Sequence, residues 1–227
     1  DNSLYKNEWA IGARFHTNGF SGFYERVWVK DIWKRRVLQA EFFYYKDYKE
    51  TKTEVNPEIT NSNRTYIYGK QNNFFQFKIA YGKRKIIANK AAKNGVRFSY
   101  NYLGGVALGL LKPYHLEIDR KVDQRIESDV FAYGEVPNDV FLGLDPDRRL
   151  VGAGGIKHGF NKLKPLPSLY AKFGFNFDWA NKEYFVKSIE VGAQLDVFYK
   201  KVPVMITSRN KPYILNFYLS IQMGKRW

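Results

Sequence analysis

Apolar and polar residues alternate along several separate stretches of the chain. In residues 213–223, for example, Leu215 and Phe217 alternate with Asn216 and Ser220. Successive side chains of a β-strand point to opposite faces, so this period of two predicts strands with one apolar and one polar face. The predicted strands, in chain order, are residues 9–17, 20–30, 38–44, 75–81, 96–102, 169–177, 189–199 and 213–223.

The second predicted strand, residues 20–30, fits the alternation least well. Neither of its faces is wholly apolar, because one carries Tyr24, Arg26 and Trp28 and the other carries Phe23, Glu25, Val27 and Val29. An extra residue in one strand of a pair re-aims the side chains that follow it. We therefore expect a β-bulge that switches the apolar face within this strand.

The links between the strands differ in length in a regular way. Three of the four links that follow odd-numbered strands are long, at 46–73, 112–167 and 200–211, and only Asn18-Gly19 is short. Strands of about ten residues, long loops at one end and short turns at the other are typical of transmembrane barrels. The pattern predicts one all-β domain over residues 1–227, an eight-stranded antiparallel up-and-down transmembrane β-barrel with long extracellular loops.

Alternation alone also fits a soluble barrel whose apolar face is turned inward. Aromatic residues make up 18% of the chain, and many lie near the ends of predicted strands, where a membrane barrel carries its interfacial girdles. These residues are Trp9, Tyr44, Tyr81, Tyr102, Trp179, Tyr199 and Tyr213. They favour a barrel whose apolar face contacts lipid.

The C-terminal segment 212–227 resembles the terminal signal of bacterial outer-membrane β-barrel proteins. Its alternating apolar positions are Phe217, Leu219, Ile221, Met223 and Trp227, although Lys225 stands where that family usually has an apolar residue. The resemblance implies location in the outer membrane and recognition by the barrel-assembly machinery. The basic, Tyr- and Phe-rich composition is similar to that of small porin-like barrels of Bacteroidota. Several of those barrels are subunits of envelope machines for secretion, gliding or outer-membrane protein assembly.

The polar face of the predicted strands carries charges of both signs. These are the basic residues Arg14, Lys78, Arg97 and Lys172 and the acidic residues Glu41, Glu190 and Asp196. The lumen of an eight-stranded barrel is just wide enough for side chains to fill it, and unpaired charges there are unfavourable. We interpret this set as a structural network of paired charges, with a narrow conductance path as the alternative.

The formal net charge of +15 is unevenly distributed. The predicted turn 83–95 has five basic residues and no acid, 30–36 has four basic residues and one acid, and 112–167 has nine of each. The short turns therefore form a basic periplasmic rim that binds lipid headgroups or an acidic periplasmic protein. Its residues are Lys34, Arg35, Arg36, Lys83, Arg84, Lys85, Lys90 and Lys93. No nucleic-acid-binding motif accompanies the charge.

Candidate catalytic groups are few. His115, Asp119 and Ser128 share the long predicted loop, and an acyl-transfer site could use His as base and Ser as nucleophile, but their spacing is not specific. Asp145-Pro-Asp147 is better explained as a turn than as a calcium loop. The chain has no Cys, so it has no thiolate metal site. We expect no catalysis, no metal and no cofactor.

The leading functional hypothesis is a non-catalytic outer-membrane barrel that acts as scaffold or accessory subunit of an envelope complex. The alternative is a surface-binding barrel whose outer loops engage lipopolysaccharide or an extracellular ligand. A lipid A-modifying enzyme is the third hypothesis. The expected partners are outer-membrane lipid, lipopolysaccharide, other envelope proteins and the barrel-assembly machinery, and not nucleic acid.

Overall fold

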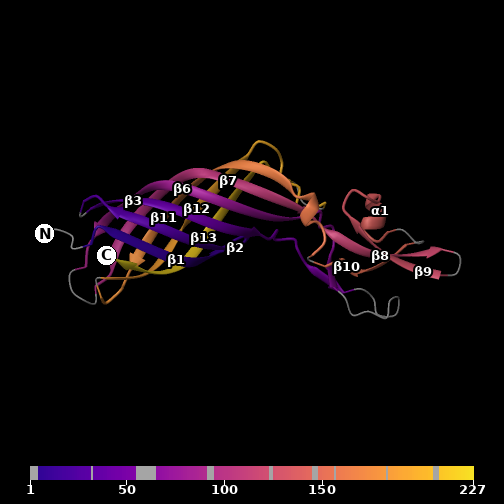
Figure 1. Cartoon of the computed structure of the whole chain (residues 1–227), viewed down its shortest axis with the longest axis horizontal. Coiled ribbons are helices and arrows are strands. Elements are labelled where there is room, and N and C mark those ends of the chain that lie inside the picture. Colours follow the sequence, from indigo (N-terminus) through magenta and orange to yellow (C-terminus); the bar gives the residue numbers. More distant parts are fainter. Residues whose placement is uncertain are drawn as a thin grey trace.

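The computed structural model describes residues 5–227 except 32, 55–64, 91–94, 123–124, 145–147, 156, 183 and 207–209, and no side chains at 120–127 or 148–149. Eight antiparallel strands close into a barrel in the order β1-β13-β12-β11-β7-β6-β3-β2 (Figure 1). They are β1 (Asn7–His16), β2 (Gly19–Val29), β3 (Lys34–Tyr45), β6 (Asn72–Ala88), β7 (Arg97–Pro113), β11 (Lys164–Asp178), β12 (Phe185–Phe198) and β13 (Tyr213–Arg226). The predicted fold class is confirmed.

The remaining elements lie at the end of the barrel opposite the two termini (Figure 1). They are β4 (Lys52–Glu54), β5 (Thr65–Ile67), β8 (His115–Val122), β9 (Arg125–Ala132), the helix α1 (Asn138–Phe141), β10 (Arg148–Ala153) and the 3-10 helix η1 (Phe160–Lys162). Strands β8, β9 and β10 form a three-stranded sheet, and β4 pairs with β5. We call residues 114–163 the outer lobe, and the end of the barrel beneath it the outer end. The end with the termini is the periplasmic end, since short turns of such barrels face the periplasm.

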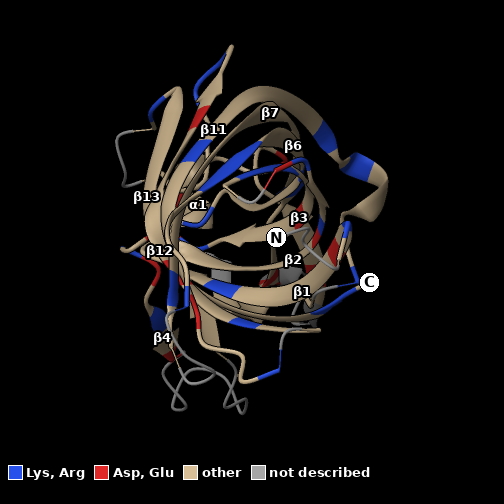
Figure 2. Ribbon diagram, turned by 90° about the vertical axis from the view of Figure 1, so that its left-hand side faces the viewer, with Lys and Arg blue, Asp and Glu red and all other residues tan. Residues whose placement is uncertain are grey.

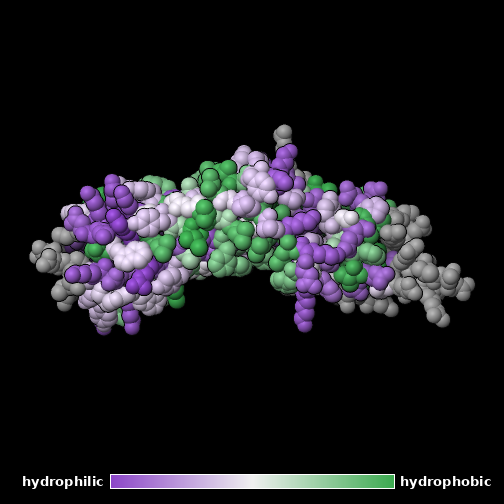
Figure 3. All heavy atoms as spheres, turned by 45° about the horizontal axis from the view of Figure 1, so that its top comes forward, coloured by the Kyte–Doolittle hydropathy of each residue, from purple (hydrophilic) through white to green (hydrophobic). Residues whose placement is uncertain are grey.

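The barrel has its apolar face outside. Phe15, Leu169 and Phe217 are 60%, 67% and 61% exposed, whereas inward-facing Arg14 and Glu190 are fully buried. Figure 3 shows hydrophobic residues gathered over the middle of the molecule, between hydrophilic ends. A soluble barrel would bury this apolar surface, so the lipid-facing interpretation holds.

Strand β2 contains no bulge, which corrects the expectation for this stretch. It pairs in continuous register with β1 from Gly19 to Trp28 and with β3 from Gly19 to Val29. Tyr24 faces outward, and Phe23 and Val27 are buried inside. Both faces are partly apolar because Phe23 packs against the Arg14 guanidinium, whose carbon lies 4.4 Å from the ring centre.

Inward-facing glycines make room for these rings. A Cβ added at Gly12 would lie 2.6 Å from the Phe23 ring, and one at Gly174 would lie 2.3 Å from the Tyr218 hydroxyl. Both distances are too short for a real contact, so larger residues there would displace an aromatic side chain. Small and large residues thus alternate inside the wall and fill the lumen.

Candidate functional site

Oppositely charged side chains are buried in equal numbers inside the barrel. Among the described residues of the barrel strands, six carboxylates and six basic groups are buried facing the lumen: Glu8, Glu25, Glu41, Asp178, Glu190 and Asp196 against Arg14, Arg35, Lys78, Arg84, Lys172 and Arg226. Burial of a charge is strongly unfavourable unless the charge is paired. The equal numbers allow every buried charge to have a partner of opposite sign.

Six of the charged residues that strand parity placed on the polar face meet in the middle of the lumen. Arg14 pairs with Glu41. Lys172 Nζ lies 2.7 Å from Glu190 Oε1, and Lys78 Nζ lies 2.7 Å from Asp196 Oδ2. Tyr218 donates a hydrogen bond to Glu190 Oε1 at 2.7 Å, so a neutral group also helps to satisfy the carboxylate. These pairs form a closed layer across the barrel.

A second layer lies nearer the periplasmic end, and it corrects two rim assignments. Arg84 Nη2 lies 2.6 Å from Glu25 Oε1, and Arg35 Nη1 lies 2.7 Å from Glu8 Oε2. Both arginines are therefore lumen residues. Strand β6 continues to Ala88, so 83–88 is strand rather than turn, and strand parity turns Arg84 inward.

The same layer contains residues that the sequence interpretation missed. Arg226 Nε lies 2.8 Å from Glu8 Oε2, and Arg226 also pairs with Asp178. Arg97 is at the edge of the network, with Nη1 3.8 Å from Asp178 Oδ2. Extending strand 9–17 by one residue at its start and strand 213–223 by three residues at its end, with the same parity, would have found Glu8 and Arg226.

The loop between β12 and β13 closes the outer end of the lumen. Val202, Val204 and Met205 are buried there. They pack against the inward-facing side chains Phe74, Leu111, Leu166, Phe198 and Ile214. The amide of Gln71 donates to the Val204 carbonyl at 2.8 Å, which fixes the loop across the mouth. We call residues 202–206 the plug. An apolar plug above a charged layer supports the structural interpretation of the lumen.

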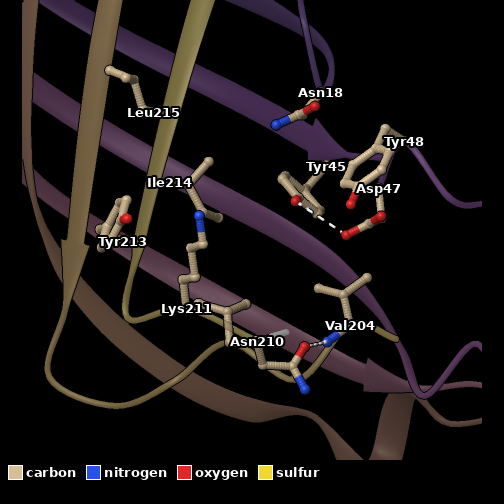
Figure 4. Close-up of a pocket in the computed structure, with 11 residues that line it drawn as sticks. Asn18, Tyr45, Asp47, Tyr48, Val204, Asn210, Lys211, Tyr213, Ile214 and Leu215 are labelled. Carbon is tan, nitrogen blue, oxygen red and sulfur yellow. Dashed lines mark hydrogen bonds between the residues drawn. The ribbon is translucent and has the colours of Figure 1, made fainter. Parts of the chain in front are cut away.

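A pocket of about 400 Å³ lies beside the plug (Figure 4). It is lined by Asn18, Tyr45, Asp47, Tyr48, Val202, Val204, Asn210, Lys211, Tyr213, Ile214 and Leu215. Tyr45 donates to Asp47 Oδ2 at 3.5 Å, and the Val204 amide donates to Asn210 Oδ1 at 3.3 Å. Several of its polar groups are thus engaged in holding the loops together.

The outer lobe has its own apolar core, formed by Tyr114, Leu116, Ile118, Val136, Val140 and Phe141. Tyr66 and Ile67 of β5 and Ile206 of the plug pack against this core. The Ile67 amide donates to the Tyr114 hydroxyl at 3.1 Å. The lobe is therefore a folded unit seated on the barrel mouth.

Two titratable groups of the lobe are shifted by their surroundings. Hydrogen bonds from Lys162 and from the Ala132 amide lower the pKa of Glu135. Burial lowers the pKa of His115, whose Nδ1 lies 2.9 Å from the Pro113 carbonyl oxygen. Both shifts favour the form that each group has at neutral pH.

The structure does not assemble the catalytic groups considered above. Ser128 donates to Asp119 Oδ1 at 2.5 Å, but His115 pairs with Ala132, four residues further along the sheet. Four residues of strand correspond to about 13 Å. In the lumen, Nε2 of buried His16 contacts both Ser21 Oγ at 2.9 Å and Glu41 Oε1 at 3.5 Å. A relay needs these partners on different ring nitrogens.

No cluster of three or more potential metal ligands occurs among the described residues. Asp145-Pro-Asp147 lies outside them. In the part of the chain that the structure describes, no helix is long and apolar enough to cross a bilayer.

The rim residues separate into distinct environments. Lys34, Arg36, Lys83 and Lys85 alternate with the inward-facing arginines and point outward from the barrel wall. Lys90 donates to the Ala180 carbonyl at 2.5 Å, and Lys93 lies outside the described residues. Figure 2 looks along the barrel from the periplasmic end and shows basic residues on the strands around it.

The apolar positions of the terminal segment all face outward. Phe217, Leu219, Ile221, Met223 and Trp227 are 61%, 45%, 43%, 59% and 49% exposed. Strand β13 pairs with β1 and closes the barrel. Recognition of this segment by the assembly machinery stays a prediction, as does an origin in Bacteroidota.

No protein-family model matches the chain, and no curated protein matches its sequence. Its fold is similar to that of Ail, the attachment invasion locus protein of Yersinia pestis, with a TM-score of 0.48, 9% identity and coverage of 98% of this chain and 99% of that one. Neisserial surface protein A gives a TM-score of 0.44, 9% identity and coverage of 97% and 95%. The N-terminal β-barrel domain of Pseudomonas aeruginosa OprF gives a TM-score of 0.40 and 5% identity, with coverage of 97% of this chain and 96% of that one. At these identities the likeness concerns the fold alone.

Closed eight-stranded barrels with an outward apolar face are the transmembrane architecture of the bacterial outer membrane. This chain has that closure and that face, and it is an outer-membrane β-barrel.

Proposed function

We propose that the protein is a non-catalytic, non-conducting barrel that presents its outer lobe for binding at the cell surface. The observation that carries the proposal is the lobe itself, which has a buried core of its own and is seated on the barrel mouth. A folded surface offers a ligand a fixed set of contacts and avoids the entropy of ordering a loop. This favours the surface-binding hypothesis over the scaffold hypothesis.

The accessory-subunit hypothesis stays a prediction with less structural support. It relied on a basic rim directed toward a periplasmic partner. Arg35 and Arg84 are buried in the lumen, and Lys34, Arg36, Lys83 and Lys85 project sideways from the wall. Mild detergent extraction followed by size analysis tests it, because a stoichiometric complex would restore this function to first place.

The lobe can be removed cleanly because Leu111 of β7 pairs with Lys164 of β11. Replacing residues 112–163 by Asn-Gly should join these strands in a two-residue hairpin. We expect the shortened barrel to fold, as heat-modifiable migration on a gel will show. Cells that display the shortened barrel should no longer bind to surfaces coated with lipopolysaccharide or to host cells.

A matched control replaces Lys200 and Lys201 by Ser. These exposed residues lie between β12 and β13, outside the lobe. This variant should bind like the parent protein. Equal binding by the parent and the shortened barrel to every surface that the parent binds would contradict the proposal, as would binding by neither.

A further inference from the structure

Four basic side chains form a compact patch on the outer wall of β3 and β6. Lys34 is directly paired with Lys85, and Arg36 with Lys83, in the register of the two strands. Alternate residues of each strand share a face, so all four lie on the outward side. We call these four residues the basic patch.

Like charges directly opposite one another destabilise a strand pair. The basic patch contains two such pairs side by side. In the described part of the chain, none of the four forms an ion pair with a carboxylate. The nearby carboxylates Glu8 and Glu25 point into the lumen, where Arg35 and Arg84 hold them. An anion outside the protein that contacts the patch would reduce this repulsion.

The neighbours of the basic patch place it at the edge of the membrane. Trp28 pairs with Arg36, and Tyr102 pairs with Lys83, so an aromatic residue flanks each side of this row. Further from the periplasmic end, the next outward pair is Leu38 with Tyr81. Trp and Tyr concentrate at the level of lipid headgroups, with apolar residues beyond them in the hydrocarbon. The four cations thus lie at the depth of the phosphates of the periplasmic leaflet.

We propose that the basic patch binds the phosphate headgroup of an anionic phospholipid in the periplasmic leaflet. The patch points sideways into the leaflet, so a lipid meets it directly. Adjacent strands are about 4.8 Å apart and alternate residues of one strand about 6.6 Å apart, which lets several of the four cations contact one headgroup. The site is independent of the outer lobe.

The rest of the rim provides an internal comparison. Lys225 pairs with Trp9 on one side and Phe185 on the other, and Lys187 pairs with Met223. These lysines are exposed at the same end of the barrel, but each has apolar or aromatic cross-strand partners. Lys187, Lys225 and the basic patch are all close to the headgroups, but only the residues of the basic patch pair directly with another cation.

The test compares two variants that each lose four positive charges. The patch variant is K34Q/R36Q/K83Q/K85Q, and the control variant is K6Q/K182Q/K187Q/K225Q. Each full-length protein is refolded and placed in nanodiscs of phosphatidylcholine alone or mixed with phosphatidylglycerol. Native mass spectrometry then measures the phospholipids that stay bound after the nanodisc is removed.

The parent and the control variant should retain phosphatidylglycerol in preference to phosphatidylcholine. The patch variant should bind phosphatidylglycerol at least about a hundredfold more weakly, since each basic residue near an anionic surface contributes on the order of 1 kcal/mol. Its binding of phosphatidylcholine should not change.

Three outcomes would overturn the proposal. The parent could show no preference for phosphatidylglycerol, or the two variants could lose it equally. The patch variant could instead keep phosphatidylglycerol and lose a polyglutamate peptide that the parent binds, which would identify a docking surface for an acidic protein. If the patch variant fails to refold, the milder K83Q/K85Q variant and the lipid preference of the parent decide the question.

Discussion

At the scale of single residues, the direction of a side chain decides what its charge does. Lys83 and Arg84 are sequence neighbours with opposite surroundings, since one is exposed on the wall and the other is 3% exposed in the lumen. Charge density suggested a common rim function for both. If the alternation is continued through residues 83–88, Lys83 and Arg84 fall on opposite faces of the strand. The wrong assignment of Arg84 to the rim came from treating a run of basic residues as a sign of a turn.

We predict that Arg84→Ala destabilises the barrel by about 3–5 kcal/mol, because it leaves the Glu25 carboxylate buried without its cation. Lys83→Ala should change the free energy of unfolding by less than about 0.5 kcal/mol. Urea unfolding of the refolded barrel in lipid vesicles, followed by tryptophan fluorescence, measures both. Similar values for the two variants would contradict the buried network.

At the scale of elements, the sequence predicted barrel strands well and the outer lobe poorly. Every barrel strand overlaps a predicted stretch, and no predicted stretch runs more than one residue past the observed strand, because the contrast between lipid and lumen imposes a period of two. Strand β8 carries the same signal over fewer residues, with Leu116 and Ile118 buried in the lobe core. Strand β8 lies inside residues 112–167, which the sequence analysis interpreted as a loop. The contacts of the lobe core with α1 and the plug join residues that are distant in the sequence, so a local pattern does not show them.

The lobe should lose stability as the pH falls, in two steps. The pKa of His115 is lowered in the folded lobe, so the unfolded chain takes up its proton first and stability declines as the pH drops below 6.5. The pKa of Glu135 is also lowered, so the stability that its carboxylate provides above pH 4.5 is lost on further acidification. Hydrogen exchange of the β8 and β9 amides measures both steps.

His115→Gln should remove the first step and Glu135→Gln the second. Exchange of the β13 amides in the barrel wall serves as the internal reference, because neither residue contacts that strand. Protection factors of the β8 and β9 amides, which correct for the pH dependence of intrinsic exchange, should fall between neutral pH and pH 4.5, and equal protection factors would contradict this linkage.

At the scale of the whole molecule, the lumen is closed twice. The plug fills the outer end, and side chains such as Arg14 and Glu190, both at 0% exposure, fill the middle. The sequence predicted the charged layer, because its residues lie on regular strands. It did not predict the plug, because Val202, Val204 and Met205 acquire their environment only when the loop folds back over the mouth.

We therefore predict that Met205→Asp loosens the plug without opening a channel. The substitution places a charge among apolar side chains, which should increase proteolysis between β12 and β13. Planar-bilayer recordings of parent and variant should show no stepwise current, because the layer of Arg14, Lys78 and Lys172 remains below. A porin inserted in the same bilayer serves as positive control, and discrete conductance in the parent would refute the closed lumen.

The unequal lengths of the strands have a mechanical consequence. Strands β6 and β7 are 17 residues long and β11 is 15, whereas β1 on the opposite side has 10. Strands β7 and β11 lead directly into the lobe, and the ladder between β6 and β7 is continuous from Asn72 with Pro113 to Ile86 with Ser99. A pull on the lobe is carried along these strands, so many hydrogen bonds are loaded together in shear. If the lobe binds a surface as proposed, we expect the tension to be carried along this ladder into the membrane-embedded wall.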